Sequence, residues 1–503
     1  MNSTLFDREL GKLGPKDLSK QVTTKLLRNF RFAPQHRFNG GHKGSATSGD
    51  RNGNSGSANS GDHDGVSDMW AHQAGVQALA LERFEGRILI SGGSDATIKI
   101  WDLEQCGNPN HAHTYKPLGI INRSNDGVKA HKFGITQLSF FPIDPEAFLS
   151  SSYDQTLKLW ATEGAQLSGN WDLGSKMYTH AISPVADHLL VACGLAHPAV
   201  RLVDLRSNAA VKTLVAPSQV SGGGAVLALA WSPRHEHILA SGTLDGAVRI
   251  WDIRRASSLL GLLDQEDSLG IFGRGTNANP HGNNPWDRGY RISAKAHSGP
   301  VNGLTWSDDG AFIISAGHDR RIRVWDAATG ANTLASFGPS IRNGQLANIP
   351  MFVTPVGLTP PKKELLFWPN ETEILVMELH EGTIITRLRG PGSQIAGVRT
   401  NRAGERSVHN RITSLVWRGS GGHGGDGSMG PVPGGTNASG GVYSGQTDGQ
   451  IRAWMPRVLE DDGINEDASE NDGGSLNQQG QKRKATAIDD AIRAMSGRNI
   501  TYT

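Results

Sequence analysis

The sequence predicts an all-β protein in which one four-stranded unit is repeated around a closed ring. The first observation is a spacing, because an aspartate is followed six residues later by a tryptophan in five places. The five pairs are Asp95–Trp101, Asp154–Trp160, Asp245–Trp251, Asp319–Trp325 and Asp448–Trp454. The second observation is that apolar and polar side chains alternate in the segment between the aspartate and the tryptophan, which is the period-two pattern of a β-strand. So regular a recurrence indicates one supersecondary unit copied along the chain.

A histidine and a serine precede three of these tryptophans at similar distances. His72, His131 and His297 lie 23, 23 and 22 residues before their aspartates, and a serine ends the apolar run between. Buried indole, hydroxyl and imidazole groups all require hydrogen-bond partners, so we expect each set to form one buried chain. The expected sets are His72, Ser91, Asp95 and Trp101; His131, Ser151, Asp154 and Trp160; and His297, Ser315, Asp319 and Trp325.

This unit resembles the WD40 repeat, whose four strands form one blade of a β-propeller. Two further segments fit the unit without its full marks: residues 200–205, with Val203 at the tryptophan position, and residues 373–377. The third strands of the units then end near positions 101, 160, 203, 251, 325, 377 and 454. We therefore expect a seven-bladed WD40 β-propeller with a short N-terminal helical extension and disordered insertions.

Changes in composition suggest how the rest of the chain is organised. Residues 39–68 are rich in Gly, Ser, Asn and Asp and almost free of apolar residues, which favours disorder. The expected segments are a helical docking extension at 1–28, an outer strand closing the last blade at 29–38, a disordered insertion at 39–68, the propeller at 69–457 with flexible insertions at 265–292 and 419–441, and a disordered tail at 458–503.

The N-terminal extension is amphipathic and basic. Phe6, Leu10 and Leu13 lie on one helical face, and residues 1–43 hold nine Lys or Arg against three Asp or Glu, a balance of +6. Two interpretations remain open. The segment is either a solvated extension or a pair of helices that docks in a groove of a partner.

Composition excludes several classes of protein. The net charge of +2 gives no overall field for nucleic acid, and no basic run alternates with aromatic residues, so direct nucleic-acid binding is not expected. Two cysteines imply no disulfide framework. No apolar run approaches the roughly 18 residues of a membrane span. We expect a soluble intracellular protein without membrane association.

The His, Ser and Asp sets offer an apparent catalytic triad. They recur in blade after blade, whereas an active site does not repeat around a ring, so we interpret them as structural. No nucleophile elbow, P-loop or dinucleotide fingerprint occurs in the sequence. The histidines at 111, 113, 235 and 237 match no standard zinc spacing. We therefore expect no enzyme activity, no catalytic residue, no metal and no cofactor.

One local motif suggests an interaction site. Trp251-Asp252 is followed by Ile253 and Arg254, which places a guanidinium group at the rim of a blade. The five donors of arginine suit carboxylates and carbonyls at interfaces. Arg206 follows Asp204 in the same way one blade earlier. The alternative is that these are ordinary surface arginines on propeller loops.

The Trp-Asp-x-Arg motif and the basic extension resemble the propellers that serve as substrate receptors of cullin-RING ubiquitin ligases. The order of the motifs, with the block at 231–257, is most similar to receptors of the Cockayne syndrome group A type. This resemblance implies a non-catalytic nuclear substrate receptor in transcription-coupled nucleotide excision repair. Its implied partners are the large damaged-DNA-binding adaptor, a Cockayne syndrome group B-like translocase and the stalled RNA polymerase complex.

The same resemblance assigns adaptor binding to a set of residues at the motif and in the extension. These are Trp251, Asp252, Arg254, Arg206, Phe6, Leu10 and Leu13. The alternative function is a WD40 scaffold of another nuclear complex, in chromatin or in RNA processing.

Overall fold

The computed structural model describes most of the region in which the repeats occur. The described residues are 10–12, 14–41, 70–106, 112–185, 188–207, 209–215, 224–255, 259–266, 294–355, 357–390, 410–418 and 441–456. The chain divides into two compact units, Met1–Arg457 and Val458–Thr503, and every described residue belongs to the first. Phe6, Leu13, the tail and most of the expected insertions lie outside the described residues.

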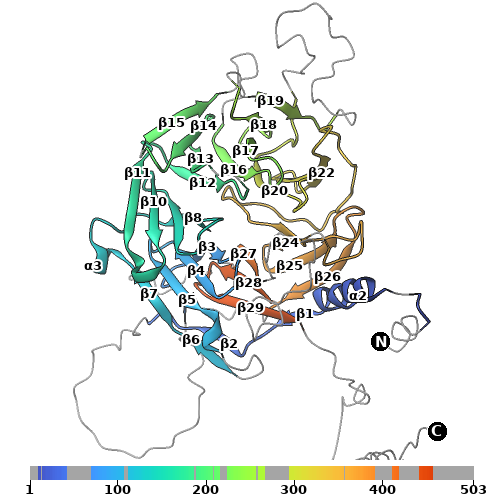
Figure 1. The fold of residues 1–503 in the computed structure, drawn as a ribbon, viewed down its shortest axis with the longest axis horizontal. Coiled ribbons are helices and arrows are strands. Elements are labelled where there is room, and N and C mark those ends of the chain that lie inside the picture. Colours follow the sequence, from blue (N-terminus) through green and yellow to red (C-terminus); the bar gives the residue numbers. More distant parts are fainter. Residues whose placement is uncertain are drawn as a thin grey trace, which may run out of the picture. The chain divides into compact units, whose positions relative to one another are not determined.

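The first unit is a seven-bladed β-propeller, as the sequence predicts. Figure 1 shows the sheets arranged around a common centre. The first four blades each have four antiparallel strands. They are β3 (Val76–Leu81), β4 (Ile88–Gly93), β5 (Ile98–Asp102) and β7 (Pro117–Ile121) in blade 1; β8 (Ile135–Phe140), β9 (Ala147–Ser152), β10 (Thr156–Ala161) and β11 (Leu167–Asp172) in blade 2; β12 (Met177–Ile182), β13 (Leu190–Leu195), β14 (Val200–Asp204) and β15 (Ala209–Leu214) in blade 3; and β16 (Val226–Trp231), β17 (Ile238–Thr243), β18 (Val248–Asp252) and β19 (Leu259–Leu263) in blade 4.

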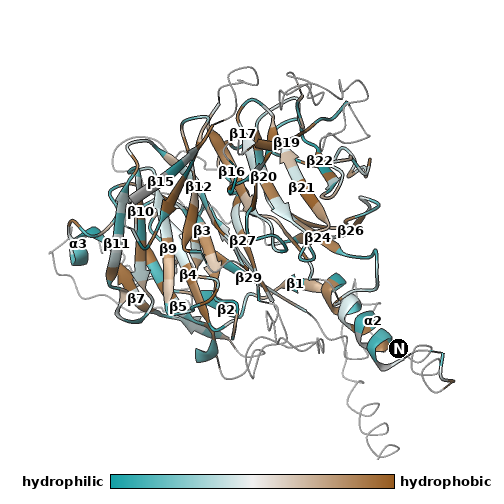
Figure 2. Ribbon diagram, turned by 45° about the horizontal axis from the view of Figure 1, so that its top comes forward, coloured by the Kyte–Doolittle hydropathy of each residue, from teal (hydrophilic) through white to brown (hydrophobic). Residues whose placement is uncertain are grey.

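Blade 5 has three described strands, and blades 6 and 7 have four. They are β20 (Val301–Trp306), β21 (Phe312–Gly317) and β22 (Ile322–Asp326) in blade 5; β23 (Phe352–Val353), β24 (Leu365–Asn370), β25 (Glu373–Glu378) and β26 (Ile384–Arg389) in blade 6; and β27 (Ile412–Arg418), β28 (Gly441–Gln446), β29 (Ile451–Pro456) and β1 (Phe30–Phe32) in blade 7. Figure 2 shows hydrophobic strands such as β3, β16 and β21 joined by more hydrophilic turns. The core therefore lies within and between the blades.

The N-terminal segment closes the ring. Strand β1 pairs antiparallel with β29, with Phe32 opposite Trp454, and so supplies the fourth strand of blade 7. Strand β2 (His36–Phe38) leaves this sheet and pairs parallel with β6 (His113–Tyr115). The single outer strand expected at 29–38 is thus two strands in two sheets. The pairing of β1 with β29 covers a sheet edge that would otherwise be open.

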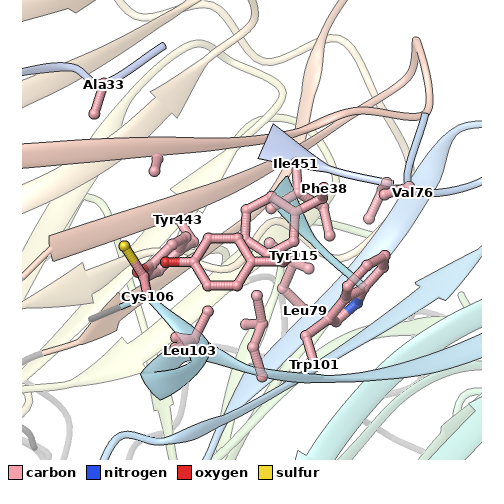
Figure 3. Close-up of a cluster of buried hydrophobic side chains, with 13 residues drawn as sticks. Ala33, Phe38, Val76, Leu79, Trp101, Leu103, Cys106, Tyr115, Tyr443 and Ile451 are labelled. Carbon is pink, nitrogen blue, oxygen red and sulfur yellow. The ribbon is translucent and has the colours of Figure 1, made fainter. Parts of the chain in front are cut away.

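An aromatic cluster fills the seam between blades 1 and 7 (Figure 3). Phe38 stacks on Tyr115 with ring centroids 4.8 Å apart, and meets Trp101 of blade 1 edge to face at 5.3 Å. It also meets Tyr443 of blade 7 at 6.1 Å. Such ring pairs add to the stabilisation from buried apolar area. Strand β2 therefore joins the first and last blades through side chains as well as through the backbone.

The helical extension is anchored at one end only. Helix α2 (Pro15–Arg28) begins with Pro15, whose fixed φ suits the first helical position. Leu27 is buried and packs in one cluster with Phe30 and Phe367, whereas Val22 is 43% exposed and Leu10 is 53% exposed. The remaining helices described are α3 (Arg123–Asp126) and the 3-10 turns η1 (Leu103–Gln105) and η2 (Glu163–Ala165). None of the described helices is long and apolar enough to cross a membrane.

In blade 1 the expected side chains lie in one buried chain. The Trp101 indole donates to the Ser91 hydroxyl at 2.8 Å, and His72 Nε2 lies 2.7 Å from the same oxygen. His72 Nδ1 lies 3.4 Å from the Asp95 carboxylate. Burial lowers the pKa of His72, while its contact with Asp95 opposes that shift. These hydrogen-bonded groups of blade 1 therefore hold the neutral His72 imidazole between the Ser91 hydroxyl and the Asp95 carboxylate.

Blade 5 repeats this geometry and adds an arginine. His297 lies 2.8 Å from Ser315 and 2.9 Å from Asp319, and Trp325 donates to Ser315 at 2.9 Å. The guanidinium of Arg323 also donates to Asp319 at 2.8 Å. Burial favours a raised pKa for Asp319, but the contacts with His297 and Arg323 hold the pKa of this carboxyl well below its usual range.

Blade 2 corrects one residue of the expected sets. The serine between His131 and Trp160 is Ser150, with distances of 2.7 and 2.8 Å, and not Ser151. Side chains alternate along β9, so Ser151 faces the other way and lies 2.9 Å from His180 Nδ1. His131 Nδ1 lies 2.9 Å from Asp154. A spacing of ten residues between serine and tryptophan holds in blades 1, 2 and 5 and identifies the correct serine.

Blades 4 and 7 satisfy the aspartate without a histidine. In blade 4, Arg249 donates to Asp245 at 2.8 Å and to Thr243 at 2.8 Å. In blade 7, Asn410 and Arg452 donate to Asp448 at 2.7 and 3.0 Å. A second donor can therefore replace the imidazole, because the carboxylate requires donors and not a particular ring.

A basic residue stands two positions before the tryptophan in every marked blade. These residues are Lys99, Lys158, Arg249, Arg323 and Arg452. Lys99 is fully buried and donates to the carbonyls of Gly40 and Ala71 at 2.9 and 2.6 Å. Burial lowers the pKa of Lys99 to about 8, and the nearby Asp95 opposes this shift. In blade 1 this position therefore fixes the loop that carries His72.

Ser91→Ala should lower the free energy of unfolding by about 2 kcal/mol, because it leaves a buried indole and a buried imidazole without their shared partner. Urea denaturation of the full chain measures this loss. Ser94→Ala is the matched control, since Ser94 is exposed and its hydroxyl accepts a hydrogen bond from the side-chain amide of Gln77 at the surface. Equal stability of the two variants would show that the buried chain does not stabilise the blade.

The burial of His180 predicts that the free energy of unfolding falls in mild acid. His180 is fully buried between Ser139 and Ser151, and burial lowers its pKa to about 3. The unfolded chain therefore takes up this proton first as the pH falls below about 6.5, and stability is lost from there down to about pH 3. Between pH 7.5 and 5 we expect this group alone to remove about 2 kcal/mol.

Urea midpoints at both pH values test this expectation. His180→Asn should show a smaller fall in stability between them, while His197→Asn, at an exposed turn, should behave like the unaltered chain. The same fall in all three proteins would contradict the role of His180.

Candidate interaction site

A pocket with a volume of about 1000 Å³ lies at the rim between blades 4 and 5. It opens on the side of the ring that carries the turns between first and second strands. Its lining combines an apolar floor with charged groups at its edge. The floor includes Ile238, Leu260, Trp306 and Phe312, and the charged edge includes Arg234, Glu236, Asp252, Arg254, Arg255 and Asp326.

The end of β18 sets the geometry of the charged edge. Asp252 is 2% exposed, and its carboxylate accepts the backbone N–H of Arg254 at 3.1 Å and two guanidinium N–H groups of Arg254 at 3.2 Å each. The guanidinium of Arg255 lies 3.3 Å from the same carboxylate. The two arginine side chains remain 63% and 56% exposed. One buried carboxylate thus orients two exposed cations.

Electrostatics keep this group ionised. Burial tends to raise the pKa of Asp252, but the hydrogen bonds and charge of Arg254 hold it below its usual range. The carboxylate raises the pKa of Arg254 in turn. The Asp252 carboxylate and the Arg254 guanidinium therefore both stay charged at neutral pH.

Blades 4 and 5 both contribute residues to the floor of the pocket, and a hydrogen bond joins the two blades there. The Trp306 indole of blade 5 donates to the carbonyl of Ala230 in blade 4 at 3.0 Å. Nε2 of His237 lies 2.7 Å from the carboxylate of Glu236 in the same lining. Preformed apolar pockets with a few placed polar groups are typical of binding sites. In the described part of the chain, no three His, Cys, Asp or Glu side chains gather to hold a metal ion.

The structure separates the residues that the resemblance grouped for adaptor binding. Arg254 and Asp252 line the pocket, but Trp251 is fully buried and donates to Ser241, so its side chain cannot contact a partner. Arg206 follows Asp204 in blade 3 and does not line this pocket. Leu10 is exposed ahead of α2. Phe6 and Leu13 fall outside the described residues.

Sequence reasoning missed the apolar floor entirely. Its residues come from strands of two blades that lie far apart in the sequence, and no local motif marks Leu260, Trp306 or Phe312. The only local signal was the Asp-x-Arg step after Trp251.

Comparison with known proteins supports the fold. The family described as WD domain, G-beta repeat matches residues 64–102, 123–161, 212–252 and 290–326. A WD repeat-containing protein of Arabidopsis thaliana, ATCSA-1, is 29% identical over 53% of this chain and 69% of its own length. Radiation-sensitive protein 28 of Saccharomyces cerevisiae is 28% identical over 42% of each chain.

Several further relatives are named for one process. The ribosome biogenesis protein WDR12 homolog of Chlamydomonas reinhardtii is 27% identical over 38% of this chain and 44% of its own length. The ribosome biogenesis protein YTM1 of Phaeosphaeria nodorum is 25% identical over 51% of this chain and 55% of its own length. Apart from ATCSA-1, the matches thus span about half of these relatives.

These relatives correct the repair assignment. Ribosome biogenesis is the process that recurs in their names, and none of the names states a ubiquitin ligase, an adaptor or a polymerase. The assignment to a cullin-RING substrate receptor in DNA repair does not stand, and neither do its adaptor, translocase and polymerase partners. The blade motifs that supported it are those of the WD domain repeat itself, so they do not identify a particular partner.

Proposed function

We propose that this protein is a non-catalytic WD40 scaffold of a nuclear RNA-processing complex, within ribosome biogenesis. Relatives named for ribosome biogenesis support the process. The observation that carries the scaffold role is the rim pocket, where Asp252 orients two exposed arginines above an apolar floor. Such a surface recognises a partner protein through one anchor side chain and one or more carboxylates.

The histidine sets favour a scaffold over an enzyme. His72, His131 and His297 are each at most 1% exposed, and their serines are shared with a buried indole. A serine that accepts a tryptophan N–H inside a blade cannot reach a substrate. These groups therefore stabilise the ring, and binding takes place on its surface.

Affinity purification of the full chain from nuclear extract, with mass identification of partners, tests the proposal. We expect pre-ribosomal factors among the recovered proteins. Arg254→Ala combined with Arg255→Ala should lower recovery of the partner that occupies the rim pocket by about tenfold, since charged hydrogen bonds are worth about 1.5–3 kcal/mol.

Arg87→Ala is the matched control. Arg87 of blade 1 donates to Asp102 at 2.8 Å, as Arg254 does to Asp252, but lies away from the pocket. Thermal unfolding should be similar for all variants. Recovery of partners without any pre-ribosomal factor would overturn the proposed process, and equal recovery by both variants would overturn the role of the pocket.

A further inference from the structure

The two sides of the ring differ in exposed charge. In each blade the first strand runs away from one side and the second returns to it, so turns between second and third strands share that side with loops that precede first strands. We call this side the loop face; the rim pocket opens on the other side. The exposed charged residues described in these turns and loops are Arg123, Lys129, Lys132, Lys176, Glu266, Lys295, Arg320, Arg321 and Arg342.

The acidic groups of these turns are already engaged. Asp154 contacts His131 at 2.9 Å, and its side chain is 4% exposed. Asp319 and Asp448 are held by arginines, with side-chain exposures of 9% and 7%. Of the exposed acids on this side, Asp172 is the last residue of the outer strand β11 and Glu266 follows the outer strand β19, so both lie towards its edge. The loop face is therefore basic although the chain as a whole carries only +2.

Aromatic side chains lie among these cations over blades 2 and 3. Tyr153 and Tyr178 meet edge to face with centroids 6.0 Å apart. Phe133 is 60% exposed, and the backbone N–H of Tyr153 donates to Gly134 next to it at 3.3 Å. Lys132 is held beside this turn by its backbone bond to Asp154 at 2.9 Å. Lys176 precedes Tyr178 by two residues in the loop before β12.

We propose that this patch, made of Lys132, Phe133, Tyr153, Lys176 and Tyr178, binds single-stranded RNA. The exposed Phe133 and Tyr153 rings supply stacking faces for bases, and flanking lysines neutralise phosphates. A cationic ligand is disfavoured by the two lysines, and an acidic peptide leaves the three rings without a matching partner. The inference goes beyond the proposed function, because it depends on the opposite side of the ring from the rim pocket.

The patch also explains why composition predicts no nucleic-acid binding. The net charge sums both sides of the ring, and the five residues come from three separate turns and loops and from the start of β12. No continuous run of the sequence alternates basic and aromatic residues. Only the propeller topology brings them together.

Fluorescence anisotropy of the full chain with a fluorescein-labelled oligouridine of about 12 nucleotides tests the proposal. We expect binding that weakens about sevenfold between 50 and 200 mM salt, as two phosphate contacts predict for a single strand. Phe133→Leu and Tyr153→Leu should each weaken binding at least about fivefold, from the loss of one stacking contact. Tyr153→Phe should retain most of it.

Lys132→Ala with Lys176→Ala should weaken binding and flatten the salt dependence. The matched control is Lys116→Ala with Lys362→Ala, two exposed lysines on the other side of the ring. Thermal unfolding checks that each variant is folded. Absence of binding by the unaltered chain, or equal binding by patch and control variants, would overturn the proposal.

A labelled oligoglutamate peptide distinguishes RNA from an acidic protein segment. We expect it to bind at least tenfold more weakly than RNA and to be insensitive to Tyr153→Leu. Peptide binding as tight as RNA binding would overturn the proposal in favour of an acidic partner. None of these outcomes depends on which proteins co-purify with the chain.

Discussion

A buried indole that donates to a serine hydroxyl fixes the middle of five blades. The bonds from Trp101, Trp160, Trp251, Trp325 and Trp454 are all 2.8 to 2.9 Å long. Each bond joins the second strand of a blade to the third, and in three blades it also holds the histidine of the preceding loop. Positions of the surface turns, and thus of any binding site, depend on this bond.

The hydrogen bonds inside the blades separate structural side chains from those that remain available for binding. The serines and histidines of the blade sets are buried and hydrogen-bonded, whereas the arginines of the rim pocket and the lysines of the loop face are exposed. The rim pocket and the loop face both follow from this division. In the first, buried Asp252 positions exposed arginines. On the loop face, the aspartates are already paired, so the exposed lysines determine the sign of the electrostatic potential.

The repeat could be predicted from the sequence because its spacing is local. The Asp–Trp distance places five third strands, and the strand pattern alone places the other two, at 200–205 and 373–377. Ser151 was chosen wrongly because two adjacent serines fit the apolar run, and only the ten-residue spacing to Trp160 separates them. Asn410 and Arg249 could not be predicted from a set that requires a histidine, because they bond to the aspartate in its place.

The surfaces could not be predicted because they depend on packing between blades. Leu260 and Trp306 meet only when blades 4 and 5 stand side by side, and Tyr153 and Tyr178 only when blades 2 and 3 do. The same reason explains the error about partners. The Asp–Trp spacing before Trp251 describes how a blade is built, whereas a partner contacts side chains from several blades at once.

The most direct test of the account is sedimentation of nuclear extract on a sucrose gradient, with the protein and pre-ribosomal RNA detected in every fraction. A scaffold of ribosome biogenesis should sediment with pre-ribosomal particles and shift to light fractions after ribonuclease treatment. Sedimentation away from pre-ribosomal RNA, unchanged by ribonuclease, would contradict it.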